Sequence, residues 1–379
     1  MPPVAKPRAV SEEELRTWGV KIRDPAVPLV ERAHAMWGLR HAREPLATRL
    51  LAAYVTEVVP PEPSSNALLQ HEAAYCLGQR GDPSAVPDLE AALRDSRHEP
   101  IVRHEAAEAL AALASAPGAD VEHIKRVLTE FRGIDIVAVA ETCEIGLGRI
   151  AWLQQPNKAP DPAAMCAEAE FPNTIDPSPA FEPDSTFSVA ELLSANDSTS
   201  SSPHFSEVVE ALSESLAAPG SALLRHEVAF ILGQLSIART GNALIERLND
   251  RQEAPMVRHE AAMALGEVAG SAEAEEGDGG ENSLAIRARQ ALLTGCRDPE
   301  PVVRDSCALA LDMADYVASN DRFQFAEHVE TNLKMGGDYP HKLLEAMPLG
   351  GGALVVLFRC PRHLGHHSIV RAGRTTSKN

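Results

Sequence analysis

Aromatic residues and cysteine motifs are scarce in this chain, and their scarcity narrows the classes of protein to which it can belong. Only 4% of the 379 residues are aromatic whereas 44% are hydrophobic, so a large core must be built mainly from Ala, Leu and Val. That composition favours helices. The six cysteines include no C-x-x-C pair, which favours a reduced protein. No stretch reaches the roughly 18 to 20 apolar residues of a membrane-spanning helix.

Positive charge is also in short supply. Lys and Arg number 35 against 54 Asp and Glu, which gives a formal charge of −19. This balance argues against a nucleic-acid or anionic-membrane partner and is compatible with a cationic one, although solubility alone explains it equally well. The N-terminal "MPPVAKPRAVSEEELRTWG" lacks the apolar run of a signal peptide, so we expect a cytoplasmic protein.

Two sequence blocks occur twice at one common offset. "QHEAAYCLGQ" begins at position 70 and "RHEVAFILGQ" at 225, while "VRHEAAEAL" begins at 102 and "VRHEAAMAL" at 257. His71 precedes His226 by 155 residues, and His104 precedes His259 by the same 155. The shared offset indicates that one unit containing both blocks was duplicated.

The period within each half is that of a helical repeat protein. The paired histidines lie 33 residues apart in both halves, as in families built from helix-turn-helix repeats. Weaker copies flank them at 30–40, 139–150 and 302–313, the last displaced by the acidic insert "SAEAEEGDGGENS" (271–283), which we expect to be a solvated loop. We therefore predict an all-α solenoid with two lobes of stacked helix pairs.

The expected organisation has five parts. A Pro-, Ser- and acid-rich segment separates the two lobes and is typical of a linker. We assign an N-terminal extension to 1–25, a first lobe to 26–155, the linker to 156–205, a second lobe to 206–330 and an unstructured tail to 331–379.

The repeated His-Glu pairs are an inventory of metal ligands. Equivalent helices of a solenoid stack at roughly 8 to 10 Å, so His71 and His104 form one ladder and His226 and His259 another. If the two halves face each other, these ligands converge. Two imidazoles and one carboxylate with open positions suit non-haem Fe(II) and oxygen chemistry better than structural zinc, and duplication would give a dinuclear centre. Adjacent helical residues point about 100° apart, so which glutamate of a half binds metal stays open.

Less specific interpretations apply to some of these residues. A lone His-Glu pair is more often a cap or a surface arrangement, and His98-Glu99 is such a case, because its counterparts at the 155 offset are Glu253 and Ala254. We expect His34 to be a packing residue. Gly78, Gly233 and Gly266 each follow a paired histidine by seven residues, where they either shape a cavity or allow tight helix packing.

With "ETCEIGLGRI" and "VVRDSCALALDM", the four His-Glu blocks resemble the deoxyhypusine hydroxylase family over about residues 26–328. The resemblance implies a HEAT-repeat fold, two Fe(II) ions per chain and O2 as co-substrate. It implies hydroxylation of the deoxyhypusine residue in the precursor of eukaryotic translation initiation factor 5A, by a monomer. Carried over to this sequence, the implied iron ligands are His71, His104 and Glu105 in one half and His226, His259 and Glu260 in the other; the implied substrate-binding residues are Glu72 and Glu227.

The chain departs from the family pattern in two places. The 155 offset from His34 falls in "STFSVAELLSAND", where no repeat pattern is present, so we expect one repeat fewer in the second lobe. The basic tail from 336 resembles nothing in the family. These departures keep a non-catalytic HEAT-repeat scaffold as the alternative function. A di-metal hydrolase with the same ligands is a third possibility, which anaerobic loss of activity would exclude.

Overall fold

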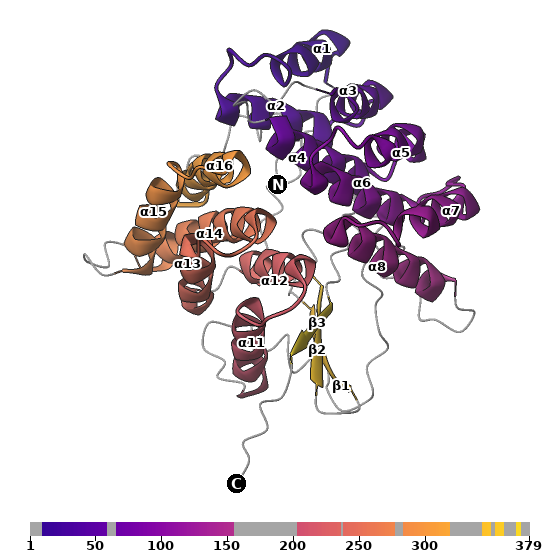
Figure 1. Cartoon of the computed structure of the whole chain (residues 1–379). Coiled ribbons are helices and arrows are strands. Elements are labelled where there is room, and N and C mark those ends of the chain that lie inside the picture. Colours follow the sequence, from indigo (N-terminus) through magenta and orange to yellow (C-terminus); the bar gives the residue numbers. More distant parts are fainter. Residues whose placement is uncertain are drawn as a thin grey trace, which may run out of the picture. The chain divides into compact units, whose positions relative to one another are not determined.

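The computed structural model describes eight segments of the chain, namely 10–58, 66–154, 203–235, 238–276, 283–318, 343–349, 353–359 and 369–372. Within these residues the chain forms two compact helical units (Figure 1). The helices of the first are α1 to α8, and those of the second are α11 to α16. The predicted all-α solenoid architecture is confirmed for both lobes.

The first unit is a stack of four helix pairs. Each odd-numbered helix packs on the even-numbered helix that follows it, and α2, α4, α6 and α8 pack in series as one layer. A short 3-10 turn, η1 (Pro83–Ala85), precedes α5. The helices are α1 (Glu12–Lys21), α2 (Leu29–His41), α3 (Pro45–Val55), α4 (Asn66–Arg80), α5 (Val86–Arg94), α6 (Pro100–Leu113), α7 (Val121–Phe131) and α8 (Val137–Leu153).

The second unit repeats this arrangement with three pairs among its described residues. Its layer of sequentially packed helices is α12, α14 and α16. The 3-10 turn η2 (Ala238–Thr240) leads into α13, as η1 leads into α5. The helices are α11 (Pro203–Leu216), α12 (Ala222–Leu235), α13 (Gly241–Asn249), α14 (Pro255–Glu276), α15 (Leu284–Gly295) and α16 (Pro301–Ala318).

Local sequence signals account for where these helices begin. Ser11 forms a capping box with Glu14 at the start of α1, so the first backbone N–H groups are satisfied by side chains. Asp120 caps α7 and Ser283 caps α15, each by a side-chain oxygen that accepts one backbone N–H of the first turn. Pro100 opens α6, at the first helical position, where the backbone N–H would have no partner within the helix.

Glycines let neighbouring helices of each layer approach closely. A Cβ added at Gly233 in α12 would lie 2.8 Å from the Cα of Ala264 in α14, and one at Gly266 would lie 2.6 Å from the carbonyl oxygen of Ala310 in α16. At Gly78 the nearest atom would be the Cα of Ala109, at 3.2 Å. Of the two roles considered for these glycines, the structure supports tight helix packing.

Some predicted boundaries are wrong. The supposed N-terminal extension contains α1, whose buried Leu15 and Gly19 belong to the first lobe. The acidic insert is not entirely loop, because α14 continues through Glu276 and residues 277–282 lie outside the described part. Most of the predicted linker also lies outside it, and α11 already begins at Pro203.

The tail predicted to be unstructured contains three described strands. They form an antiparallel sheet in the order β1 (Leu343–Leu349), β2 (Ala353–Arg359) and β3 (Ile369–Ala372). The apolar run that forms β2 is rich in Val and Leu, and β-branched and bulky apolar residues favour strands. No helix in the described ranges is long and apolar enough to cross a membrane.

Candidate metal centre

In the first unit, α4 and α6 bring three of the predicted metal ligands together. His71 lies on α4 and His104 at the equivalent position of α6, so the packing of these two helices stacks the imidazole rings with centroids 5.6 Å apart and planes at 28°. Oε2 of Glu105 lies 3.2 Å from Nε2 of His71 and 3.6 Å from Nε2 of His104. One ligand atom from each of the three lies within 4.8 Å of the others.

The second unit contains the same arrangement on α12 and α14. The rings of His226 and His259 have centroids 5.7 Å apart and planes at 29°. Oε2 of Glu260 lies 3.6 Å from Nε2 of His226 and 3.5 Å from Nε2 of His259. The duplicated sequence has therefore produced two donor sets with nearly equal geometry.

Both donor sets are buried. His104 and His259 are fully shielded from solvent, and the other four residues are at most 7% exposed. Adjacent ionisable groups are rarely buried unless a charge partner or a cation compensates for their lost hydration. Two imidazoles and a carboxylate that converge at such a buried position are a suitable first set of ligands for Fe(II), which accepts nitrogen and oxygen donors.

Electrostatics in the first unit favour a positive charge at this point. Burial by itself lowers the pKa of His71, but the carboxylates of Glu105 and Glu72 outweigh burial and raise that pKa to about 10. Glu72 approaches from the other side of the ring, with Oε1 3.4 Å from Nδ1. A cation between Nε2 and Glu105 would take over the role of the imidazole proton.

The outer nitrogen of every paired histidine also has a described neighbour. Oε1 of Glu227 lies 3.2 Å from Nδ1 of His226, as Glu72 does at His71. Nδ1 of His104 contacts the hydroxyl of Thr142 on α8, and Nδ1 of His259 contacts that of Ser306 on α16. Sequence reasoning missed both hydroxyl residues, although each lies within a repeat copy that it had singled out.

Comparison with known proteins identifies the family to which the chain belongs. The HEAT repeats family model matches residues 62–130. Deoxyhypusine hydroxylase of Mus musculus is 36% identical over 335 residues, which cover 85% of this chain and 98% of that protein. Deoxyhypusine hydroxylase-B of Oryza sativa subsp. japonica is 37% identical over 317 residues, or 80% of this chain and 94% of that protein. The chain belongs to the deoxyhypusine hydroxylase family.

A solved structure supports the same assignment. Human deoxyhypusine hydroxylase in complex with glycerol is 32% identical in sequence and superposes with a TM-score of 0.59, covering 80% of this chain and 97% of that one. The resemblance deduced from the His-Glu blocks is therefore confirmed. In this member of the deoxyhypusine hydroxylase family, the blocks that carry the resemblance are also the ones that form the two donor sets.

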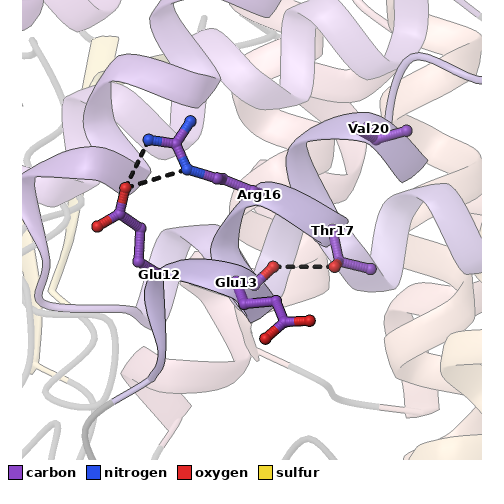
Figure 2. A pocket seen from close by; sticks show the side chains of 5 residues that line it. All are labelled: Glu12, Glu13, Arg16, Thr17 and Val20. Atoms are coloured by element: carbon purple, nitrogen blue, oxygen red, sulfur yellow. Dashed lines mark hydrogen bonds and ion pairs between the residues drawn. The ribbon is translucent and has the colours of Figure 1, made fainter.

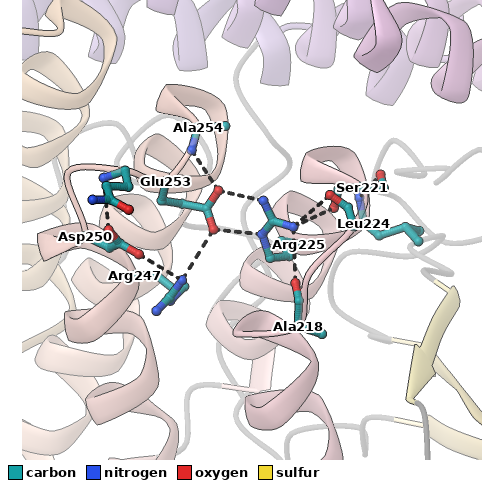
Figure 3. Close-up of polar contacts among 10 residues, drawn as sticks. Ala218, Ser221, Leu224, Arg225, Arg247, Asp250, Glu253 and Ala254 are labelled. Atoms are coloured by element: carbon teal, nitrogen blue, oxygen red, sulfur yellow. Dashed lines mark hydrogen bonds and ion pairs between the residues drawn. The ribbon is translucent and has the colours of Figure 1, made fainter.

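The residue before the first histidine of each lobe forms hydrogen bonds with neighbouring turns and helix ends, and these hold the histidine's helix in place. In the second lobe Arg225 donates to both carboxylate oxygens of Glu253, at 2.7 and 2.8 Å, and to the carbonyl oxygens of Ala218 and Gly220 (Figure 3). In the first lobe of this deoxyhypusine hydroxylase family member, Gln70 donates to the carbonyl oxygen of Tyr54 instead. Both arrangements satisfy carbonyl groups in the last turn of the preceding helix or just beyond it, and they fix the start of the helix that carries the histidine.

Other candidate residues lie apart from the donor sets. His98 occupies the turn before α6, as expected of a pair unrelated to the site. His34 packs against Trp37, with ring centroids 5.7 Å apart. Burial raises the pKa of the Cys76 thiol to about 12, which makes it a poor nucleophile. A shallow surface pocket on α1 is lined by Glu12, Glu13, Arg16, Thr17 and Val20 and contains no histidine or cysteine (Figure 2).

Proposed function

We propose that this chain hydroxylates the deoxyhypusine residue of the precursor of eukaryotic translation initiation factor 5A, with one Fe(II) held by each lobe. The observation that carries the proposal is the pair of buried donor sets, each with two imidazole Nε2 atoms around one carboxylate oxygen. They occur in a chain of the deoxyhypusine hydroxylase family. The residues assigned to iron are His71, His104 and Glu105 in the first lobe and His226, His259 and Glu260 in the second.

The iron would supply activation of O2. In a hydroxylation of this kind, one oxygen atom enters a C–H bond of the substrate and the other leaves as water, with two electrons and two protons from an external reductant. The protein's part is to hold the ligands in place, to keep bulk water away from them through burial, and to position the substrate carbon.

Glu72 and Glu227 are assigned to substrate binding. Deoxyhypusine is a lysine extended by an aminobutyl arm, so it presents ammonium groups on a long flexible chain. Carboxylates grip such groups by charge-assisted hydrogen bonds. Both glutamates lie directly beside a metal-ligand histidine, which would bring a bound ammonium group close to the reacting centre. The formal charge of −19 also favours the approach of a basic protein segment.

The two alternative functions, a non-catalytic scaffold and a di-metal hydrolase, require different things of the same residues. A scaffold has no need of two imidazoles and a carboxylate in each of two buried pockets, so the donor sets favour the enzyme. A di-metal hydrolase would use the same ligands without oxygen. The four described cysteines are not in disulfides, which supports a reducing, cytoplasmic setting for the enzyme.

The test is hydroxylation of a deoxyhypusine-containing substrate protein by the iron-loaded full chain, measured by mass spectrometry as the gain of one oxygen atom. We expect turnover in air with a reductant and none under anaerobic conditions. We expect His259→Ala to abolish hydroxylation, and His98→Ala, a buried histidine outside both donor sets, to leave it unchanged apart from any effect on folding. Full activity of His259→Ala, or turnover without O2, would contradict the proposal.

A further inference from the structure

A buried hydroxyl group contacts Nδ1 of the second histidine of each lobe. Nδ1 of His104 lies 3.1 Å from Oγ1 of Thr142, and Nδ1 of His259 lies 2.9 Å from Oγ of Ser306. The two hydroxyl residues are at most 1% exposed. Each belongs to the helix that follows in the layer, α8 in the first lobe and α16 in the second.

The direction of these hydrogen bonds follows from the second contact of each hydroxyl. Oγ1 of Thr142 lies 2.8 Å from the carbonyl oxygen of Ala138, and Oγ of Ser306 lies 2.6 Å from that of Val302. A carbonyl oxygen carries no hydrogen, so the hydroxyl must donate its only proton to it. The hydroxyl oxygen then accepts from the imidazole, and Nδ1 of each histidine must carry a proton.

A proton on Nδ1 decides which nitrogen can bind metal. In a neutral imidazole with Nδ1–H, the lone pair is on Nε2. Nε2 is the atom that faces Glu105 in His104 and Glu260 in His259, at 3.6 and 3.5 Å. The hydroxyl therefore turns the ligating nitrogen of each histidine toward the carboxylate of the same donor set.

The duplication kept this hydroxyl while changing the residue that supplies it. Thr142 and Ser306 are 164 residues apart, the same distance as Glu141 and Asp305, which immediately precede them. One lobe uses threonine and the other serine, so what the two copies share is the hydroxyl group. The first histidine of each lobe has a carboxylate at the corresponding nitrogen instead, from Glu72 or Glu227.

We propose that Thr142 and Ser306 are positioning residues that hold His104 and His259 in the Nδ1–H tautomer and orient Nε2 toward the iron. The inference rests on the proposed metal-binding function. Outer hydrogen-bond partners of metal-bound histidines commonly change metal affinity by about 10- to 100-fold when they are removed.

The experiment measures Fe(II) affinity of the full chain by competition with a chelator. Thr142→Val keeps the shape of the side chain and removes the hydroxyl, so we expect the first site to weaken by about 10- to 100-fold while the second stays unchanged. Ser306→Ala should weaken only the second site. The conservative exchanges Thr142→Ser and Ser306→Thr keep the hydroxyl and should restore affinity close to that of the wild type.

A second measurement, by NMR, detects the proton on Nδ1 of each metal-bound histidine. In Co(II)-loaded protein, each Nδ1–H of a histidine bound through Nε2 gives a strongly shifted NMR signal that disappears in D2O. We expect the His104 signal to be lost or to exchange with water much faster in Thr142→Val, whereas the signal from His71, whose outer partner is Glu72, persists. A residue that served packing alone would leave this exchange unchanged.

Matched controls separate the hydroxyl's role at the metal from its role in the helix. Ser215→Ala and Thr129→Val also remove a hydroxyl that bonds the carbonyl four residues earlier, and neither should change metal affinity. If the wild type binds iron and Thr142→Val and Ser306→Ala bind it equally well, the inference is wrong and the proposed function stands. If the wild type binds neither iron nor cobalt, the proposed function fails and the inference fails with it.

Discussion

Glu227 and Glu72 have two proposed tasks, orienting a histidine and binding substrate, which a substitution can separate. Each places one carboxylate oxygen near Nδ1 of the adjacent histidine, at 3.2 Å for Glu227 and 3.4 Å for Glu72. A glutamine at the same position keeps a carbonyl oxygen that can accept from Nδ1–H but removes the negative charge. The two tasks, orienting the imidazole and binding an ammonium group, thus differ in their need for charge.

We therefore expect Glu227→Gln to retain both irons and to lose substrate binding. A hydrogen bond to a charged group contributes about 1.5–3 kcal/mol, so kcat/KM should fall by roughly 10- to 150-fold. Steady-state hydroxylation assays together with iron analysis of the same preparation measure both quantities. Loss of iron with the charge would assign Glu227 to the metal centre instead.

At this scale the sequence predicted the six candidate metal ligands but not the hydroxyl groups that contact two of them. The 155-residue offset singles out His71, His104, His226 and His259 because these histidines, each followed by a glutamate, recur at matched positions in both halves, whereas His98 does not. Thr142 and Ser306 were overlooked because Ser and Thr are ordinary helix residues. Their role depends on which atom they face across two helices, and sequence periodicity alone does not specify that.

At the scale of the helix, close packing between α12 and α14 depends on Gly233. An added Cβ would lie 2.7 Å from the Cβ and 2.8 Å from the Cα of Ala264, and backbone cannot yield as a flexible side chain does. Overpacking of this kind costs about 1–3 kcal/mol. We expect Gly233→Ala to reduce the free energy of unfolding by this amount, which lowers the urea midpoint. We also expect it to weaken iron binding in the second lobe, since Gly233 lies on the same helix as His226.

Gly133→Ala is the control for that prediction. A Cβ at Gly133 would meet nothing within 4 Å, and a Gly to Ala change at a compatible position is neutral or slightly stabilising. If the urea midpoint of Gly233→Ala equalled that of Gly133→Ala, α12 and α14 could move apart without loss of stability, and the prediction would be wrong.

Asp298, in the turn between α15 and α16, links that turn to α14. It is 2% exposed, forms ion pairs with Arg258 and Arg251, and accepts the backbone N–H of Glu300 at 3.0 Å. Burial raises the pKa of its carboxyl, but the hydrogen bonds from Arg258 and Glu300 and the two positive charges outweigh burial and lower it below its usual range.

A lowered pKa in the folded state implies acid sensitivity of the second lobe. The stabilisation is fully present above the carboxyl's unfolded pKa of about 3.9 and is lost as pH falls through the folded pKa. Asp298→Asn removes one partner of a buried pair and should cost about 3 kcal/mol at pH 7. We expect the urea midpoints of variant and wild type to begin to approach each other as pH falls below about 4, and to meet only below the lowered folded-state pKa, where the wild-type carboxyl is also protonated.

Asp315→Asn provides the comparison for Asp298. Asp315 also pairs with an arginine, Arg289, but its side chain is 71% exposed, and exposed pairs contribute about 0–1 kcal/mol. A constant difference between Asp298→Asn and wild type from pH 7 to pH 3 would contradict the assignment of the effect to this carboxylate.

At the scale of the whole molecule, the sequence predicted a two-lobed solenoid because the repeats recur with a fixed period. The described residues contain four helix pairs in the first unit and three in the second. The segment 181–202, in which no repeat was expected, lies outside the described residues, so the shorter second lobe stays a prediction. Boundaries were less predictable: nothing in the pattern around Leu15 indicated that α1 packs into the first lobe.

In the proposed function each lobe holds its own iron through two histidines and one glutamate. Elemental analysis of iron per chain after anaerobic loading with Fe(II), for the wild type, His71→Ala and His226→Ala, tests this stoichiometry directly. We expect two irons in the wild type and one in each variant, because each variant removes a ligand from one donor set only. Two irons in both variants, or none in a folded wild-type chain, would contradict one iron per lobe.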